Sequence, residues 1–212
     1  MKLYGDHESG NCYKIRLLLG HLDRSYEWVD VDILARETRT PQFLEKNPNG
    51  RVPVVELDDG NHLAESNAIL WYLARGTDFL PAPPFDQAKT LEWLFFEQYS
   101  HEPYIATSRF WIHYLDAREQ YADKLAEKRE PGYHALRVME RHLAGRPFFV
   151  GPRMTIADVA LYAYTHVAGE GDFDLGGFPA VRSWLDRVAA VPGHVPMRRR
   201  SRSAAGGAKP AR

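Results

Sequence analysis

The chain has 212 residues and a mass of 24.3 kDa, with 44% hydrophobic and 26% charged residues, which excludes a disordered chain and a fibrous repeat. No apolar run approaches the roughly 20 residues that a membrane span needs, and no secretory apolar stretch follows the start. The lone Cys12 excludes an internal disulfide and a Cys-rich zinc site. The net charge is −1, but residues 1–197 hold 21 basic and 28 acidic side chains, which argues against nucleic-acid binding by the folded part. We expect a soluble cytoplasmic protein.

Strand and helix patterns alternate over the first 76 residues. Strands are predicted over Lys2–Gly5, 26–31, 52–57 and 61–64, the last two joined by the turn Asp58-Asp59-Gly60. Helices are predicted after Ser9, over Pro41–Lys46 and from Ser66 to Gly76; the first carries apolar residues at Cys12, Ile15, Leu18, Leu19 and Leu22. The order β-α-β-α-β-β-α predicts a mixed sheet of four strands.

The chain changes character after residue 76. Residues 77–85 contain three prolines and predict a linker. From 86 to 197 only helical patterns occur, with a kink or break at Pro103, a capping box at Thr155-Ile-Ala-Asp158, and a last helix over 178–191. Residues 198–212 hold six basic and no acidic residues. This tail suits either an arm for an anionic partner or a disordered, solvated extension, and we favour the extension.

Three segments in the first 76 residues carry chemistry. Ser9 and Asn11 lie at a helix start, where their side chains and the free backbone N–H groups can donate hydrogen bonds to an anion. Lys14 adds positive charge one turn later. Taken alone, Ser9 or Asn11 is more often simply the N-cap of a helix.

The second segment is Asn47-Pro48-Asn49-Gly50-Arg51-Val52-Pro53. Pro53 precedes a strand and is a candidate cis proline that would turn the Val52 backbone outward, toward an extended ligand; an ordinary trans turn is the alternative. The third segment, Glu65-Ser66, places a carboxylate beside a helix start. It would suit the ammonium and carboxylate of an α-amino acid, or simply cap the helix. No metal-ligand spacing, phosphate loop or Gly-x-Ser-x-Gly elbow is present.

Together these motifs resemble those of the cytosolic glutathione transferases. The motifs are Ser9-x-Asn11-Cys12, Asn47-Pro48-x-Gly50-Arg51-Val52-Pro53, Glu65-Ser66-x-Ala68-Ile69 and Thr155-Ile-Ala-Asp158. The resemblance spans roughly residues 1–195 and is greatest for bacterial serine-type members of the theta and nu-like classes. It implies a thioredoxin-like α/β domain over 1–76, a linker over 77–85 and an all-α helical domain over 86–197.

The resemblance also implies the site. Glutathione would be the co-substrate, with no metal. It would pair with the backbone of Val52 beside Pro53, place its γ-glutamyl head at Glu65 and Ser66, and place its glycyl carboxylate near Thr38, Arg39 and Arg51. The thiol would then meet Ser9 and Asn11, which lower its pKa.

The second substrate would lie between the domains, against His101, Tyr104, Ser108 and Trp111, which share one helical face. The same face could equally pack into the helical core or against a second subunit. The implied activity is attack of the glutathione thiol on small electrophiles in detoxification, by a homodimer. The alternatives are a glutathione-dependent disulfide reductase and a non-catalytic glutathione-binding protein. The beta-class pattern fits poorly, because its catalytic cysteine would fall near Gly10 rather than at Cys12.

Overall fold

The computed structural model describes residues 1–198, so the predicted tail lies outside the described residues except for Arg198. The four predicted strands form one sheet in the order β2-β1-β3-β4. They are β1 (Lys2–Gly5), β2 (Glu27–Asp30), β3 (Val54–Glu56) and β4 (His62–Ala64). β1 runs parallel to β2 and antiparallel to β3, which forms a hairpin with β4. The expected mixed sheet is thus confirmed, with shorter strands.

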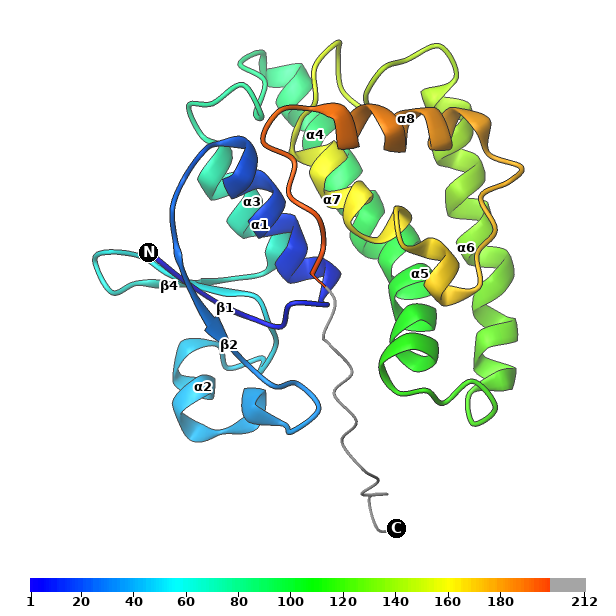
Figure 1. Cartoon of the computed structure of the whole chain (residues 1–212). Helices are drawn as coiled ribbons and strands as arrows, with labels where there is room; N and C mark the ends of the chain where they lie inside the picture. Colours follow the sequence, from blue (N-terminus) through cyan, green and yellow to red (C-terminus); the bar gives the residue numbers. More distant parts are fainter. Residues whose placement is uncertain (199–212) are drawn as a thin grey trace.

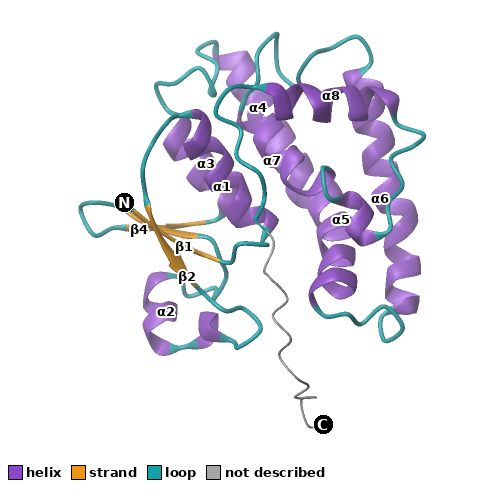
Figure 2. Ribbon diagram, in the orientation of Figure 1, coloured by secondary structure: helices purple, strands orange, loops and turns teal. Residues whose placement is uncertain are grey.

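Helices cover both faces of this sheet (Figures 1 and 2). α1 (Gly10–His21) and α3 (Ser66–Ala74) lie on one face, and α2 (Pro41–Lys46) lies on the other. α2 closes a small apolar cluster made by Val31, Phe43 and Val54. α1 is buried beyond its expected apolar stripe, because the sheet, α3 and the second domain enclose it; nine of its 12 residues are buried.

The second domain contains only helices within the described residues. They are α4 (Pro84–Phe96), α5 (Glu102–Arg109), α6 (Ala122–Leu143), α7 (Ile156–Thr165) and α8 (Pro179–Ala190). Two π-helical turns, η2 (Glu97–His101) and η3 (Phe110–Tyr114), flank α5. Pro103 is the second residue of α5, directly after the first π turn; the helix does not break there, and the predicted irregularity takes the form of this π turn.

α7 joins the two domains. Its N-terminus carries the predicted capping box: Thr155 Oγ1 accepts from Ala157 N at 3.3 Å, and Asp158 Oδ2 accepts from Thr155 N at 2.8 Å. All ten residues of α7 are buried, and the helix packs against α1. Gly10 allows this approach, because a Cβ there would lie 2.4 Å from the Tyr164 ring. One apolar core therefore runs through both domains.

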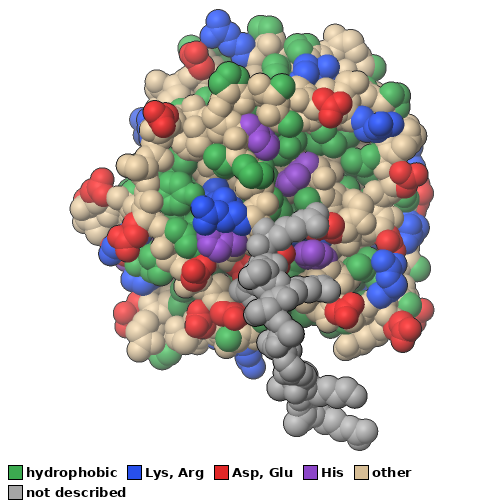
Figure 3. All heavy atoms as spheres, viewed as in Figure 1, with side chains coloured by type: hydrophobic (Ala, Val, Ile, Leu, Met, Phe, Trp, Pro, Cys, Tyr) green, Lys and Arg blue, Asp and Glu red, His purple; other side chains and the backbone are tan. Residues whose placement is uncertain are grey.

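The chain then returns to the first domain. After α8, residues 191–198 run back across α1 (Figure 1), where the carbonyl of Val195 accepts from the Tyr13 hydroxyl at 2.8 Å. Acidic and basic side chains are interspersed over the face drawn in Figure 3, with several histidines near its centre. Within residues 1–198, no helix has the length and apolar character needed to cross a bilayer.

Candidate functional site

A cavity of about 500 Å³ lies where the loops at one end of the sheet face α5, η3 and α7. Six of the residues predicted to meet glutathione line it. They are Ser9, Asn11, Thr38, Arg39, Arg51 and Val52. The Val52–Pro53 peptide bond is cis, as the sequence suggested. The cavity therefore brings together residues from the first two predicted segments.

Ser9 both caps α1 and faces this cavity. Its Oγ accepts from Cys12 N at 3.4 Å, as an N-cap residue does. The hydroxyl still carries its own hydrogen, which can be donated to an anion in the cavity. The N-terminus of α1 adds the positive end of the helix dipole at the same place. The two interpretations of Ser9, as a cap and as a donor, are compatible.

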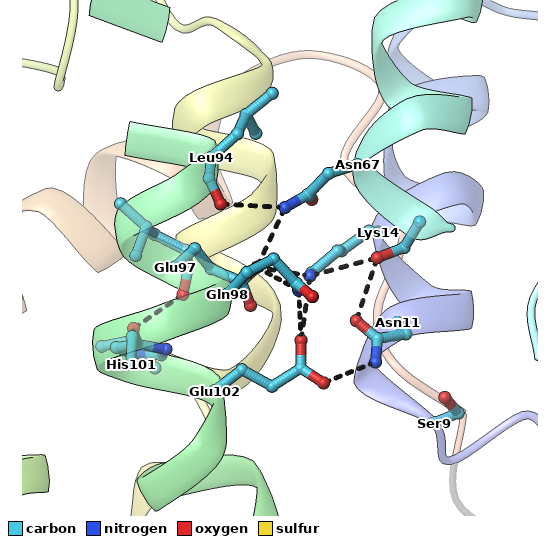
Figure 4. A network of polar contacts seen from close by, with 12 residues as sticks. Ser9, Asn11, Lys14, Asn67, Leu94, Glu97, Gln98, His101 and Glu102 are labelled. Carbon is cyan, nitrogen blue, oxygen red and sulfur yellow. Dashed lines mark hydrogen bonds and ion pairs between the residues drawn. The ribbon is translucent and has the colours of Figure 1, made fainter. Parts of the chain in front are cut away.

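The side-chain amide of Asn11 is held from both sides. Its Nδ2 donates to Glu102 Oε1 at 2.9 Å, and its Oδ1 accepts from the Ser66 hydroxyl at 3.1 Å. Glu102 belongs to α5 and also lines the cavity, so this contact joins the domains (Figure 4). An amide nitrogen carries two hydrogens, which leaves one for a ligand beside Ser9.

Lys14 does not act in the cavity, which corrects the expectation that its charge reaches an anion near Ser9. Its side chain is fully buried, and its Nζ lies 2.9 Å from Glu97 Oε2 and 3.6 Å from Glu102 Oε2. It also donates to Ser66 Oγ at 3.3 Å. Figure 4 shows Lys14 pointing from α1 toward the carboxylates of η2 and α5. The sequence does not reveal this, because the partner carboxylates lie 83 and 88 residues away.

Further donors complete this interdomain network. Asn67 Nδ2 donates to Glu97 Oε2 at 3.1 Å, and Gln98 Nε2 donates to Glu97 Oε2 at 2.9 Å and to Glu102 Oε2 at 2.6 Å. Glu97 is completely buried, and its other oxygen, Oε1, has no hydrogen-bond partner. One ammonium thus faces two carboxylates in an environment where unpaired charge is costly.

The third predicted segment lies beside the cavity rather than on its wall. Ser66 is 6% exposed, and its hydroxyl donates to Asn11 and accepts from Lys14. Glu65 is exposed and adopts φ 67° and ψ 111°, an unfavourable backbone for a residue with a side chain. Such conformations persist where the surroundings impose them and cluster at functional sites. Glu65 and Ser66 thus lie at the start of α3, next to Asn11.

The opposite end of the cavity is basic. Arg39 and Arg51 line it together with Thr38 and Gly50. The Arg39 guanidinium donates to the Asn49 carbonyl at 3.1 Å, which ties it to the loop before Val52. Gly50 has φ +62°, and a Cβ there would lie 2.8 Å from the Thr38 carbonyl oxygen, so both its own backbone conformation and the neighbouring main chain require glycine.

The predicted second-substrate residues lie elsewhere. His101 is fully buried, with its Nε2 2.9 Å from Thr165 Oγ1, and Ser108 is 2% exposed. Tyr104 and Trp111 face α6, where Lys128 Nζ lies over both rings. The cavity is lined instead by the neighbouring positions Glu102, Ala106, Thr107, Arg109, Phe110 and Tyr114, with Tyr164 from α7 and Ile33. Sequence spacing identified a helical face, but one turned away from the cavity.

Arg109 and Tyr114 on this wall are already paired. The buried Arg109 lies 2.6 Å from Glu170 through its Nε and donates to the Glu8 carbonyl at 2.8 Å. The Tyr114 hydroxyl donates to Asp6 Oδ1 at 3.0 Å. Burial raises the pKa of Tyr114 well above its ordinary value, so the phenol keeps its proton. This end of the cavity is therefore chiefly aromatic and carries little net charge.

Cys12 lies away from this chemistry. It is fully buried, and burial raises its pKa to about 12, so it is a thiol at neutral pH. No group of His, Cys, Asp or Glu among residues 1–198 has the arrangement of a metal site.

Comparisons with known proteins agree with this architecture. Residues 1–75 match the family model of the glutathione S-transferase N-terminal domain, and residues 93–192 match that of the C-terminal domain. A glutathione S-transferase structure from Pseudomonas fluorescens is 54% identical, with a TM-score of 0.91 over 92% of this chain and 98% of that one. A glutathione transferase homologue from Lodderomyces elongisporus, solved with two GSH per subunit, is 28% identical, with a TM-score of 0.81 over 91% and 94%.

A curated relative points to a second kind of chemistry. The disulfide-bond oxidoreductase YfcG of Escherichia coli is 30% identical over 190 residues, which covers 86% of this chain and 87% of that protein. Both halves of the chain match family models, and the thioredoxin-like and helical domains meet at one cavity. The chain therefore belongs to the glutathione S-transferase family.

Proposed function

We propose that this protein binds glutathione in the cavity described above and activates its thiol for attack on small electrophiles. The observation that carries the proposal is the position of Ser9 and Asn11, at the N-terminus of α1, on one wall with Val52. A ligand strand along Val52 would bring its central residue to this helix end. The basic loop at Thr38, Arg39 and Arg51 then suits the glycyl carboxylate.

The chemistry is stabilisation of a thiolate. A thiol is mostly protonated at neutral pH, and the thiolate is the nucleophile. The Ser9 hydroxyl, the remaining Asn11 N–H and the helix end all favour the charged sulfur. A hydrogen bond to a charged group contributes about 1.5–3 kcal/mol, or one to two pKa units. We place the electrophile against the aromatic wall of Phe110, Tyr114 and Tyr164.

The pH–rate profile of single variants tests this assignment. Ser9→Ala and Asn11→Ala should each lower the rate constant at neutral pH about ten- to a hundredfold. The loss should shrink at alkaline pH, where glutathione ionises unaided. Ser183→Ala, at an exposed position of α8, is the matched control and should behave like the wild type. Profiles that coincide with the wild type for both site variants would overturn the assignment.

The amino-acid head group is tested by affinity. We propose that Glu65 holds the γ-glutamyl ammonium and that Ser66, with the N–H groups of α3, holds its carboxylate. Glu65→Ala and Ser66→Ala should weaken glutathione binding at least about tenfold and change the chemical step much less. Ser66→Ala also removes a partner of Asn11 and Lys14, so Glu65→Ala is the cleaner variant. Unchanged affinity in a calorimetric titration of Glu65→Ala would contradict the proposal.

Disulfide reduction is the second candidate activity. It is favoured by the fixed amide of Asn11 beside the thiol position and by the similarity to an oxidoreductase. A panel containing a halogenated nitroarene and a small disulfide separates the two reactions. Retention on immobilised glutathione with no turnover of either substrate would instead indicate a binding protein.

We further propose a cytoplasmic homodimer with a role in detoxification. Support for the dimer comes from large apolar side chains on α4 and η2: Phe85, Phe95 and Tyr99 are 74%, 62% and 80% exposed. Isolated exposed apolar residues are ordinary, but three on one helical segment favour a covered surface. A sedimentation mass near 24.3 kDa at micromolar concentration would contradict a dimer.

A further inference from the structure

Arg16 is a buried cation that forms no ion pair within residues 1–198. Its side chain is only 5% exposed, its Nη1 has no hydrogen-bond partner, and no carboxylate of residues 1–198 lies within ion-pair distance. The guanidinium lies over the Trp28 ring, 5.8 Å from the ring centroid, which orients it but supplies no countercharge. Proteins rarely bury an unpaired charge, because desolvation costs several kcal/mol per ion.

Arg16 lines a groove of about 520 Å³ toward the C-terminal end of α1. The groove is bounded by α1, by the loop before β2, and by residues 195–198 of the returning chain. Two further arginines, Arg24 and Arg198, line it, against a single acid, Asp23. Ser25 and Tyr26 also line it. The groove therefore combines an excess of positive charge with residues that can donate to an anion.

The His7 imidazole lies close enough to this groove for the charges of two of its arginines to act on it. The His7 ring stacks on the Trp28 side chain, with the two ring centroids 4.2 Å apart. Burial lowers the pKa of His7; Asp30 and Asp6 act to raise it, and the charges of Arg16 and Arg198 act to lower it further. Both guanidiniums therefore act on one small region between β1, α1 and the returning chain.

We propose that this groove binds a phosphate group, either free or as the monoester of a small molecule. A dianion with several oxygens matches two or three guanidiniums better than a carboxylate, which offers two oxygens in one plane. An extended nucleic acid fits less well, because residues 1–197 carry a net charge of −7 and would repel a polyanion. The anion supplies the countercharge that Arg16 lacks, and so links residues 195–198 to α1.

Calorimetric titration of the full-length protein with inorganic phosphate tests the proposal, at constant ionic strength and without glutathione. One saturable site is expected, with no heat beyond dilution when sodium chloride replaces phosphate. Arg16→Met should weaken phosphate binding at least about tenfold, because it removes a charged donor. Arg182→Met, at an exposed arginine of α8 with the same change in charge, should bind phosphate as the wild type does.

A second titration, with glycerol 2-phosphate, separates the two sources of the group. Tighter binding of the ester assigns the groove to a phosphorylated small molecule, and equal or weaker binding assigns it to free phosphate. The melting temperature adds an independent readout. In chloride buffer Arg16→Met should melt at or above the wild-type temperature, since an uncompensated buried charge is gone. A lower melting temperature, with phosphate affinity intact, would mean that Arg16 is structural and would overturn the proposal.

Arg24→Gln keeps the test decisive should Arg16→Met fail to fold. Arg24 is exposed and donates to the Leu73 carbonyl at 3.3 Å, so its loss should leave the fold intact. A clear fall in phosphate affinity is expected. Wild-type affinity in Arg24→Gln, or equal heats with phosphate and chloride, would refute a phosphate site. Glutathione turnover without phosphate should stay at the wild-type level in each soluble variant.

Discussion

Replacing Lys14 by methionine should be among the most destabilising single changes in this protein. Lys14 and Glu97 are both completely buried, 2.9 Å apart, at the junction of the two domains. At that distance and an effective dielectric constant of about 20, their attraction is about 6 kcal/mol. Desolvation of both ions offsets part of this. Removing one partner of a buried pair typically costs about 3–5 kcal/mol, because the other charge stays buried and uncompensated.

The structure makes the remaining charge especially costly. Without the ammonium, Glu97 would keep its donors Asn67 and Gln98, but its Oε1 is unpartnered already, and Glu102 would face it across the vacated space. A double-mutant cycle that combines Lys14→Met with Glu97→Gln isolates the interaction free energy between the two side chains. Lys14→Met should lower the urea-unfolding free energy by about 3–5 kcal/mol. The double variant, which removes both charges, should recover at least about 1 kcal/mol of that loss.

An exposed ion pair supplies the matched control. Lys89→Met removes a lysine paired with Glu92 on the surface of α4, and should cost less than about 1 kcal/mol. The reasoning is refuted if Lys14→Met unfolds within about 1 kcal/mol of the wild type, or if the two changes add without coupling. A surviving Lys14→Met protein should also bind glutathione more weakly, because Ser66 loses the donor that fixes its hydroxyl toward Asn11.

Three further outcomes test other parts of the molecule. Cys12→Ser should retain glutathione turnover, and the native thiol should resist a water-soluble maleimide at pH 7, since burial raises its pKa to about 12; loss of activity would instead favour cysteine chemistry. Burial lowers the pKa of His101 to about 3, so its contribution to stability is present above pH 6.5 and is lost as the pH falls toward 3. In urea titrations, the free energy of unfolding of the wild type should therefore fall between pH 7 and pH 5. In His101→Gln, whose side chain can still bond to Thr165, this fall should be smaller by about 2 kcal/mol. Gly10→Ala should destabilise by about 1–3 kcal/mol in the same assay, because its Cβ would overlap the Tyr164 ring; an unchanged midpoint would contradict that packing.

The first domain was predictable because its signals are local. Asp58-Asp59-Gly60 forces a turn, Thr40 accepts from Phe43 N at the start of α2, and alternating short strands leave few other arrangements. The predicted strand 52–57 shortens to β3, since the ladder begins only after Pro53, which has no N–H to donate, and ends at Glu56 before the turn. In the second domain the capping box located α7 for the same reason. Where contacts within four residues along the chain determine the conformation, the sequence alone is sufficient to predict the element.

Other features depend on contacts that no local pattern contains. Pro131 lies inside the 22-residue α6, where a proline usually ends a helix. The helix continues, and the adjacent Gly132 is packed so closely that a Cβ would lie 2.4 Å from the Phe173 ring. Lys14 would be placed on the surface by its chemistry alone, yet it is buried because two carboxylates of the second domain meet it. Such placements follow from how the domains dock.

Domain docking also explains why the second-substrate wall was displaced. His101, Tyr104, Ser108 and Trp111 share a face at helical spacing, and that face is buried against α6 and α7 in part. The cavity is lined instead by Glu102, Ala106, Arg109 and Phe110, which lie one or two residues away from that face on the same helical segment. Periodicity alone cannot choose between adjacent faces of a helix enclosed on several sides, since each contacts something. The Asn11 amide, which donates to Glu102, marks the face of α5 that meets α1 at the cavity. That contact joins residues 91 positions apart, so no local pattern in the sequence contains it.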